Sequence, residues 1–181
     1  MITLKAQEDS ESYDFLTGLP MRNRGEKLVA QFMQEFDGCL VFMDMDNLKK
    51  INDIYGHKAG DRALCTLGHL LSEIAEGSVL CRLGGDEFLL FLPDVSKETV
   101  SETVKQLLEK FQSIKSKDPE LQYASISAGL CMTEESQIPK VVDRIFLQYH
   151  KLYNKSNSIN FIPKYEYIAM TKNNGTADSK N

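Results

Sequence analysis

Uninterrupted apolar runs alternate along the chain with segments whose apolar residues recur at helical spacing. Residues 39–45 are apolar apart from one aspartate, and residues 88–92 are apolar throughout. Such runs predict strands buried on both faces, in a sheet that helices cover. Residues 78–83 predict a further strand. Gly84-Gly85, between the predicted strands 78–83 and 88–92, predicts a tight hairpin turn, because glycine tolerates positive φ.

The remaining elements follow from helical spacing and from strict alternation. Helices are predicted over about 22–36, 47–55, 97–116 and 138–153, and a longer one that residues 59–61 lead into and Gly77 ends; strands are predicted over 121–131 and 159–169. This order suits an α/β (α+β) sandwich, with a central, mostly antiparallel sheet flanked by helices. We expect residues 1–12 to form a polar N-terminal lead or a helix, 13–169 one domain, and 170–181 a disordered tail.

Charge and cysteine spacing limit the classes of protein. The net charge of −5 over 181 residues argues against nucleic acid as the main partner. The four cysteines lack the spacing of a zinc or redox pair, so we expect reduced thiols without a disulfide framework. No signal pattern and no apolar run of membrane-spanning length occurs, which predicts a cytoplasmic protein without a membrane partner.

Acidic residues stand where two of the predicted strands meet loops. Asp44 and Asp46 alternate with methionines at the end of the first strand, so both point to one side. Asp86 and Glu87 stand at the hairpin tip. Carboxylates at such ends can converge on a hard cation, and paired Mg²⁺ ions about 3.5–4 Å apart serve in-line attack on phosphoryl groups. The alternatives are a solvated acidic turn at the tip and a helix N-cap at Asp44.

Residues 84–88, Gly-Gly-Asp-Glu-Phe, match the signature of the GGDEF family, the diguanylate cyclases. Further segments resemble the family's other motifs in the same order, at residues 14–22, 44–53, 56–61 and 125–129. The resemblance implies a fold like the palm of nucleotide polymerases and the class III nucleotidyl cyclases. It also implies condensation of two GTP into cyclic di-GMP with loss of two pyrophosphates, in a homodimer whose domains each bind one GTP.

The resemblance assigns the metal and catalytic roles residue by residue. Asp44, Asp86 and the backbone carbonyl of Met45 look like ligands of Mg²⁺ or Mn²⁺, with two ions per active site. Glu87 looks like a further ligand or the group that helps to deprotonate the 3′-hydroxyl. Lys49 can reach the phosphates or the charge that develops during transfer, and its alternative is a solvated helix lysine.

The substrate-binding roles fall on the segment between the two acidic clusters. Asn52 and Asp61 look like the guanine readers, and the aspartate favours guanine over adenine. His57 lies in the predicted turn between them, as a substrate contact or as an ordinary turn histidine. The N–H groups of Asn47 and Leu48, at the first turn of a helix, suit phosphate oxygens.

Other positions of the family's pattern differ here or have a structural interpretation. The family's inhibitory R-x-x-D motif is replaced by Ala75 and Ser78, which predicts that feedback inhibition through that site is absent. Asp14 and Arg22 are expected to form a structural ion pair. No sensor domain is recognisable ahead of residue 13, so control would come from a missing N-terminal domain or a separate partner protein.

The last predicted helix departs most from the family. His150 and Asn154 stand where the family has the Lys and Arg that hold the terminal phosphate. Lys151 and Lys155, one residue further on, have the same i, i+4 spacing and could supply these contacts. The intact signature favours an active cyclase. The altered helix favours the alternative, a catalytically weak domain that binds GTP or a protein partner as a regulatory module.

Overall fold

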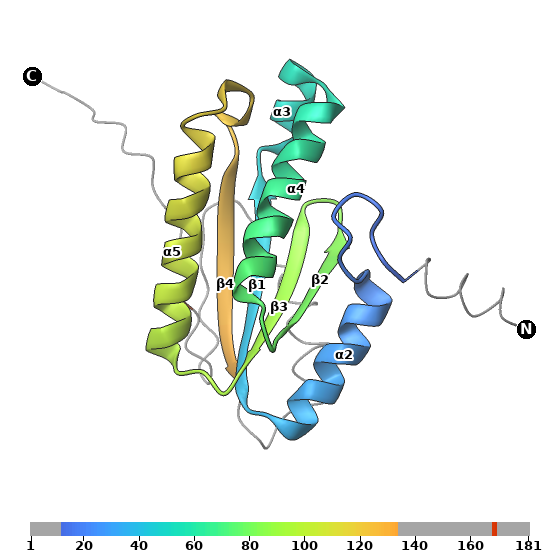
Figure 1. The fold of residues 1–181 in the computed structure, drawn as a ribbon, viewed down its shortest axis with the longest axis vertical. Helices are drawn as coiled ribbons and strands as arrows, with labels where there is room; N and C mark the ends of the chain where they lie inside the picture. The colour runs from blue at the N-terminus through green and yellow to red at the C-terminus, as the bar shows by residue number, and fades with distance from the viewer. Residues whose placement is uncertain (1–11, 134–167, 170–181) are drawn as a thin grey trace, which may run out of the picture.

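The computed structural model describes residues 12–133 and 168–169, which form an antiparallel sheet with helices packed on it (Figure 1). The sheet has five strands in the order β2-β3-β1-β4-β5. The strands are β1 (Gly38–Asp46), β2 (Val79–Gly84), β3 (Glu87–Pro93), β4 (Ser125–Thr133) and β5 (Ile168–Ala169). The helices are α2 (Arg22–Glu35), α3 (Leu48–Tyr55), α4 (His57–Ile74), α5 (Lys97–Lys115) and the 3₁₀ turn η1 (Pro119–Leu121). The predicted fold class is therefore confirmed.

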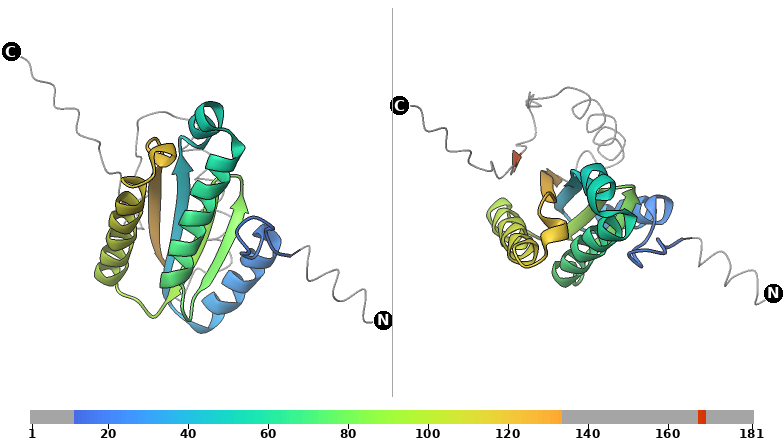
Figure 2. Two further views of the ribbon diagram at one scale, coloured as in Figure 1. Left: turned by 45° about the horizontal axis from the view of Figure 1, so that its top comes forward. Right: turned by 90° about the horizontal axis from the view of Figure 1, so that it is seen from above.

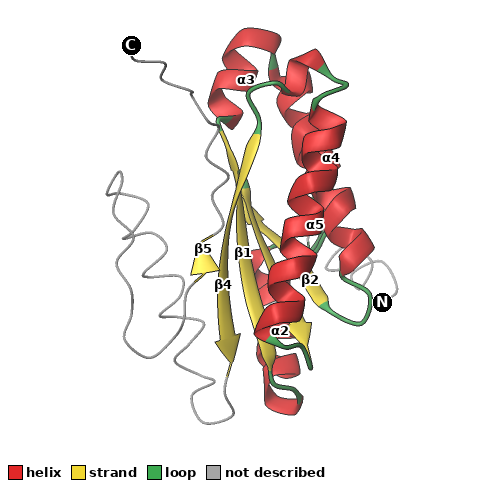
Figure 3. Cartoon of the chain, turned by 90° about the vertical axis from the view of Figure 1, so that its left-hand side faces the viewer, coloured by secondary structure: helices red, strands yellow, loops and turns green. Residues whose placement is uncertain are grey.

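Alternation along the strands divides the buried residues into two cores. Val41 and Met43 of β1 belong to a core that also contains apolar residues of α4 and α5. Leu40 and Phe42 belong to the other core, together with Val29 of α2. Figures 2 and 3 show α4 and α5 along one side of the sheet. The sheet is thus buried on both faces, as the continuous apolar runs predict.

Helix ends follow the local sequence where polar caps are present. Ser96 Oγ accepts a hydrogen bond from the N–H of Thr99 at the start of α5. Glu98 in the first turn and Lys115 in the last turn complement the helix dipole. These signals explain why the predicted bounds of this helix agree closely with the structure.

Two predicted bounds are wrong. The predicted strand 121–131 is two elements, because Pro119 begins a 3₁₀ turn in which the Asp118 carboxylate accepts the N–H of Glu120 at 3.0 Å. The strand itself starts only at Ser125. Helix α4 already begins at His57, whereas the sequence predicts that residues 59–61 only lead into it.

Part of the predicted C-terminal structure lies outside the described residues. The predicted helix 138–153 falls wholly there, and of the predicted strand 159–169 the structure describes only β5. This strand pairs with Gly129 and Leu130 of β4. None of the described helices is long and apolar enough to span a bilayer.

The thiols belong to the packed interior. All four cysteines are free, and Cys39, Cys81 and Cys131 are buried. Burial raises the pKa of Cys39 and Cys81 to about 12 and that of Cys131 to about 11. Such thiols stay protonated at neutral pH and act as small apolar side chains.

Candidate active site

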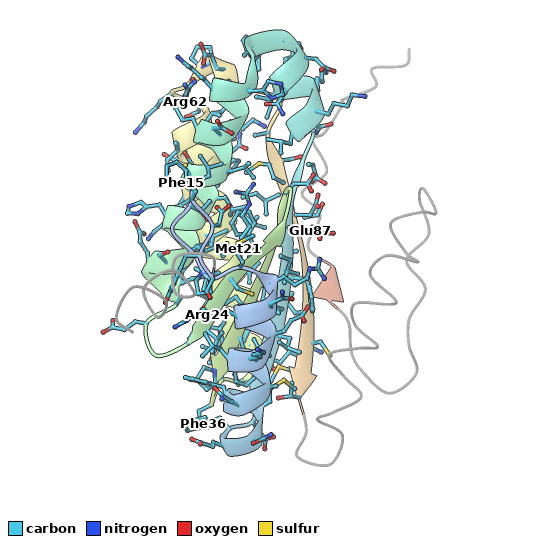
Figure 4. The ribbon with its side chains drawn as sticks, turned by 90° about the vertical axis from the view of Figure 1, so that its right-hand side faces the viewer. Phe15, Met21, Arg24, Phe36, Arg62 and Glu87 are labelled. Carbon is cyan, nitrogen blue, oxygen red and sulfur yellow. The ribbon has the colours of Figure 1, made fainter. Side chains whose placement is uncertain are left out.

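The register of β1 and β3 brings two carboxylates together at one end of the sheet. Asp44 stands directly opposite Glu87, on the face that Leu40 and Phe42 occupy earlier in β1. Directly opposed residues have Cβ atoms about 4.5–5.5 Å apart. Asp44 is 3% exposed and Glu87 is half-buried. Glu87 lies beyond the N-terminal end of α2 (Figure 4). The two acidic clusters predicted to converge therefore meet through this pair.

The hairpin turn joins the signature to the end of β1. Gly84 and Gly85 have φ of 145° and 51°, which confirms the glycine-dependent turn. Asp86 lies in this turn, half-buried, one residue before β3. Its carbonyl oxygen accepts the N–H of Met45 at 3.0 Å. The tip of the hairpin is thus hydrogen-bonded to the end of the central strand.

The acid pair fits a cation that is shared with a phosphate. Among the described residues, no three His, Cys, Asp or Glu side chains gather closely enough to hold a metal by themselves. Mg²⁺ commonly takes one or two protein carboxylates and completes its shell with water and substrate phosphates. Asp44 and Glu87 provide such a pair. The roles of Asp86 and of the Met45 carbonyl as additional ligands stay predictions.

Asp46 is held on the same side of β1 as Asp44 by strand β4. Its carboxylate accepts hydrogen bonds from Ser125 Oγ at 3.1 Å and Ser127 Oγ at 2.8 Å. Both serines lie opposite this end of β1 in the register of β1 and β4. The predicted orientation of the two aspartates is therefore confirmed, and Asp46 has structural partners.

The predicted guanine readers meet where α3 packs on α4. A Cβ atom built on Gly60 would lie 2.0 Å from Asn52 Oδ1, so the amide rests against the start of α4, next to Asp61. Asn52 Oδ1 is buried and has no hydrogen-bond partner among the described residues. Leaving such an atom unsatisfied costs about 1–3 kcal/mol. Asp61 is exposed. The arrangement offers a buried amide and an accessible carboxylate to a ligand.

The loop between β1 and α3 carries the predicted phosphate-binding groups. Asn47 adopts a left-handed conformation with φ of 63°, and its Nδ2 donates to the carbonyl of Tyr123 at 3.2 Å. Leu48 is the first residue of α3, and Lys49 follows it with an exposed side chain. His57 is also exposed, but it is the first residue of α4 and not part of a turn.

A set of surface contacts braces α3 and α4 against the residues around η1. We call it the η1 brace, and it comprises Tyr55, Arg62, Asp118, Glu120 and Tyr123. The Tyr55 and Tyr123 rings are stacked, with centroids 6.3 Å apart. Arg62 Nε donates to Asp118 Oδ2 at 3.0 Å, and its Nη2 donates to Glu120. Arg62 follows Asp61 directly, so the brace fixes the turn of α4 that carries a predicted guanine reader.

The expected ion pair between Asp14 and Arg22 is wrong, because Asp14 pairs with Arg82. Arg82 Nη1 lies 2.8 Å from Asp14 Oδ2, and Arg82 Nε donates to the carbonyl of Gly85 at 3.1 Å. Figure 1 shows the turn formed by residues 13–20 beside the tip of the β2–β3 hairpin. Arg82 stands two residues before Gly84 in the sequence. This closeness to the glycine turn is the sequence feature that could have indicated its contact with the hairpin tip.

Asp14 is also held within its own turn. Its Oδ2 accepts the N–H of Thr17 at 2.8 Å and the Thr17 hydroxyl. Burial alone would raise the pKa of Asp14, but the hydrogen bonds from Thr17 and Arg82 outweigh it and keep the pKa below its usual value. The carboxylate is therefore charged at neutral pH and holds Arg82 against the hairpin tip.

Arg22 reaches the acid pair from the first turn of α2. Its Nη2 lies 3.4 Å from Glu87 Oε2, and its Nη1 lies 3.6 Å from Glu26 Oε1. Its Nε donates to the carbonyl of Leu83 at 3.1 Å. Sequence reasoning missed this contact, because 65 positions separate Arg22 from Glu87 and no local pattern links them.

Lys151 and Lys155 lie outside the described residues, as do His150 and Asn154. Their contacts with a terminal phosphate therefore stay predictions. The other predicted site residues lie at the β1–β3 end of the sheet, at the α3–α4 junction, and between them in the chain at residues 47–49, where β1 leads into α3.

Comparison with known proteins identifies this arrangement. The family model described as "Diguanylate cyclase, GGDEF domain" matches residues 11–154. The chain belongs to the GGDEF family. In Escherichia coli K12, the diguanylate cyclase DgcP is 36% identical over 133 residues, which are 67% of this chain and 38% of DgcP. The cyclic di-GMP phosphodiesterase PdeR of the same organism is 32% identical over 126 residues, which are 67% of this chain and 19% of PdeR.

Solved GGDEF structures share the fold. The GGDEF domain of DgcB from Caulobacter crescentus, crystallised with c-di-GMP, superposes with a TM-score of 0.68 at 21% identity. The match covers 81% of this chain and 92% of that domain. The chain spans well under half the length of the two curated E. coli relatives. The family likeness thus concerns this domain, while the activities of those longer proteins belong to the whole chains.

Proposed function

We propose that this GGDEF domain is a diguanylate cyclase, which condenses two GTP into cyclic di-GMP and two pyrophosphates. The observation that carries the proposal is the pairing of Asp44 with Glu87 across β1 and β3. This pairing unites the Asp-x-Asp segment and the signature on one face of the sheet. A carboxylate pair of this kind suits metal-assisted attack of a 3′-hydroxyl on an α-phosphate.

The acidic residues hold the cation and accept the proton. Asp44, Asp86, Glu87 and the Met45 carbonyl would hold Mg²⁺ or Mn²⁺, two ions per active site. When bound, such ions neutralise phosphate charge and make the attacking hydroxyl more acidic. Glu87 is the residue that we assign to take up the 3′-hydroxyl proton, because its half-buried carboxylate stands opposite Asp44 at the end of the sheet where the ions would be held.

The phosphates extend along the loop after β1. The N–H groups of Asn47 and Leu48 point out of the first turn of α3, where the helix dipole favours an anion. Lys49 is exposed on the same turn and can swing its ammonium group onto the triphosphate. Lys151 and Lys155 would contact the terminal phosphate.

The base sits at the α3–α4 junction. Asp61 would accept the N1–H and 2-amino protons of guanine, and the Asn52 amide would bond to the ring. Asn52 Oδ1 is buried and has no hydrogen-bond partner within the part of the chain that the structure describes, which supports this assignment, since a donor on the base would satisfy it. His57 is exposed at the first residue of α4, close enough in sequence to serve as an additional contact.

The reaction requires two such domains, because each active site supplies one GTP to the product. Purified protein would be incubated with GTP and Mg²⁺ at several protein concentrations, and the nucleotides separated by chromatography. We expect cyclic di-GMP at a specific rate that rises with protein concentration, as assembly of a homodimer requires. Absence of product at every concentration would overturn the proposal.

The same assay tests feedback inhibition. Ala75 and Ser78 occupy the turn between α4 and β2, where the N–H of Ser78 donates to the carbonyl of Ala75 at 2.9 Å. Neither side chain can grip a guanine or a phosphate as Arg and Asp do. We therefore expect added cyclic di-GMP to leave the initial rate unchanged, apart from competition at the active site.

A second candidate function is a weak or inactive domain that binds GTP or a protein partner as a regulatory module. The substitutions at His150 and Asn154 favour it. PdeR, which is named as a phosphodiesterase, shows that a chain similar to this one occurs in a protein named for another activity. Bound GTP without product would support this candidate, as would biological output that survives the change Glu87→Gln.

A further inference from the structure

We propose that Arg22 is a positioning residue of the acid pair Asp44 and Glu87. Its guanidinium neutralises Glu87 when no cation is bound and releases Glu87 when a cation binds. The inference rests on the proposed function, because it concerns the carboxylate that would bind the cation. It adds a residue of α2 to a site otherwise built from strands and from helices α3 and α4. The contacts that carry it are those of the Arg22 guanidinium.

Positive charge beside Glu87 lowers the repulsion between Asp44 and Glu87 when no cation is bound. Two carboxylates on directly opposed residues repel each other, and Asp44 is 3% exposed, so water screens the repulsion poorly. The guanidinium of Arg22 lies 3.4 Å from Glu87 Oε2. It therefore supplies, on the protein side of the pair, part of the charge that a divalent cation would bring.

The main chain and Glu26 keep Arg22 in place whether or not it contacts Glu87. Nε is bonded to the carbonyl of Leu83, and Nη1 faces Glu26 one helical turn further along α2. A guanidinium has donors on three sides and a fixed plane, so one contact can open while the others remain. When Glu87 turns to a cation, Arg22 retains Glu26 and Leu83 as partners.

The distances agree with a contact that opens easily. Both ion pairs, at 3.4 and 3.6 Å, are longer than a close charge-assisted hydrogen bond, and about a third of the Arg22 side chain is exposed. Partly exposed pairs of this kind contribute little free energy. The cost of releasing Glu87 is accordingly small, and it corresponds to a change of about two- to fivefold in cation affinity.

The test is a titration of the full chain with Mn²⁺, followed by the electron paramagnetic resonance signal of the free ion. It is run with and without a GTP analogue that carries carbon between the α- and β-phosphorus atoms. The variants are Arg22→Met, Glu26→Gln and the charge-matched control Lys27→Met, which removes one positive charge from an exposed position of α2. Thermal unfolding without metal is measured on each protein.

Arg22→Met should bind Mn²⁺ about two- to fivefold more tightly than the unaltered protein, while its unfolding temperature without metal falls. Glu26→Gln should bind Mn²⁺ about twofold more weakly, because Arg22 loses the charge of Glu26 and then holds Glu87 more strongly. Lys27→Met should change the affinity by less than Arg22→Met. The pairing of tighter binding with lower stability is a result that a merely structural arginine would not give.

The outcomes separate this inference from the proposed function. Unchanged or weaker Mn²⁺ binding by Arg22→Met, or an equal gain in Lys27→Met, would refute the role of Arg22 and leave the cyclase proposal intact. Should Arg22→Met fail to fold, stronger binding by Glu26→Gln would refute it independently. No Mn²⁺ binding by the unaltered protein, even with the analogue, would overturn both.

Discussion

The two ends of the candidate active site are built in different ways. At the β1–β3 end, strand register sets the position of Asp44 and Glu87, and the surroundings are packed. At the α3–α4 end, Asn52 and Asp61 are placed by helix packing and by the largely exposed contacts of the η1 brace. The end that would perform chemistry is fixed by the sheet. The end that would recognise the base depends on surface contacts and is easier to alter.

The largest effect should come from removing the acid itself. Glu87→Gln keeps the size of the side chain but removes its charge and its basicity. We expect cyclic di-GMP formation to fall at least about 100-fold, as loss of a general base commonly does. The rate is measured by nucleotide chromatography. Glu35→Gln, at the exposed end of α2, is the control and should retain full activity; equal activity in Glu87→Gln would remove the acid pair from the mechanism.

Asp14→Asn tests the contact between the N-terminal turn and the hairpin tip. The charged hydrogen bonds to Thr17 and Arg82 should make the unaltered protein more stable at pH 7 by about 2 kcal/mol. Because the pKa of Asp14 is lowered in the fold, this advantage is present above its unfolded value, near 3.9, and is lost as the pH falls through the lower folded value. Urea unfolding from pH 7 to pH 3 should show the two proteins converging. A difference in unfolding free energy that persists or widens in acid would contradict a lowered pKa of Asp14.

Gly60→Ala tests the α3–α4 end of the site without replacing any polar side chain. The new methyl group would lie 2.0 Å from Asn52 Oδ1, so the amide must move away from the start of α4. We expect KM for GTP to rise about tenfold with little loss of stability, since alanine is the better helix former. Gly68→Ala on the same helix is the matched control, because its Cβ would meet Thr17 at an ordinary 3.4 Å. Equal KM values in the two variants would show that Asn52 does not read the base.

Arg62→Ala should have the smallest effect. Its ion pairs with Asp118 and Glu120 are largely exposed, and such pairs contribute below about 1 kcal/mol. We expect a small fall in unfolding temperature and a rise of a few-fold in KM for GTP, with kcat unchanged. A large fall in kcat would mean that the η1 brace reaches the chemical end of the site, and would remove the contrast between the two ends.

Sequence reasoning predicted the elements and the two acidic clusters because both depend on local patterns. Continuous apolar runs identified β1 and β3, and the Gly-Gly pair identified the turn between β2 and β3; the register of β1 and β3 that brings Glu87 opposite Asp44 is set by the fold. The start of α4 was missed because Gly56, with φ of 82°, separates two helices without any intervening loop. Gly56, followed shortly by Gly60, predicts a turn around His57 rather than the start of a helix.

The long-range ion pairs of Arg22 and Arg82 could not be predicted in the same way. Arg22 and Arg82 find their carboxylates 65 and 68 positions away, across elements whose relative placement only the fold determines. Long side chains can reach several acids from one backbone position, so the sequence leaves the pairing open. The predicted partners Asp14 and Arg22 were near each other in the chain, whereas the observed partners are near each other in space.

The hydrogen bond from Met45 to the Asp86 carbonyl places a natural probe at the edge of the signature. β1 is a central strand, flanked by β3 and β4, so its amide protons should exchange with solvent only on rare, extensive opening. The N–H of Met45 differs from its neighbours because its acceptor belongs to the turn. The ratio of its hydrogen-exchange rate to that of the Met43 amide therefore reports how often the tip of the hairpin detaches from β1.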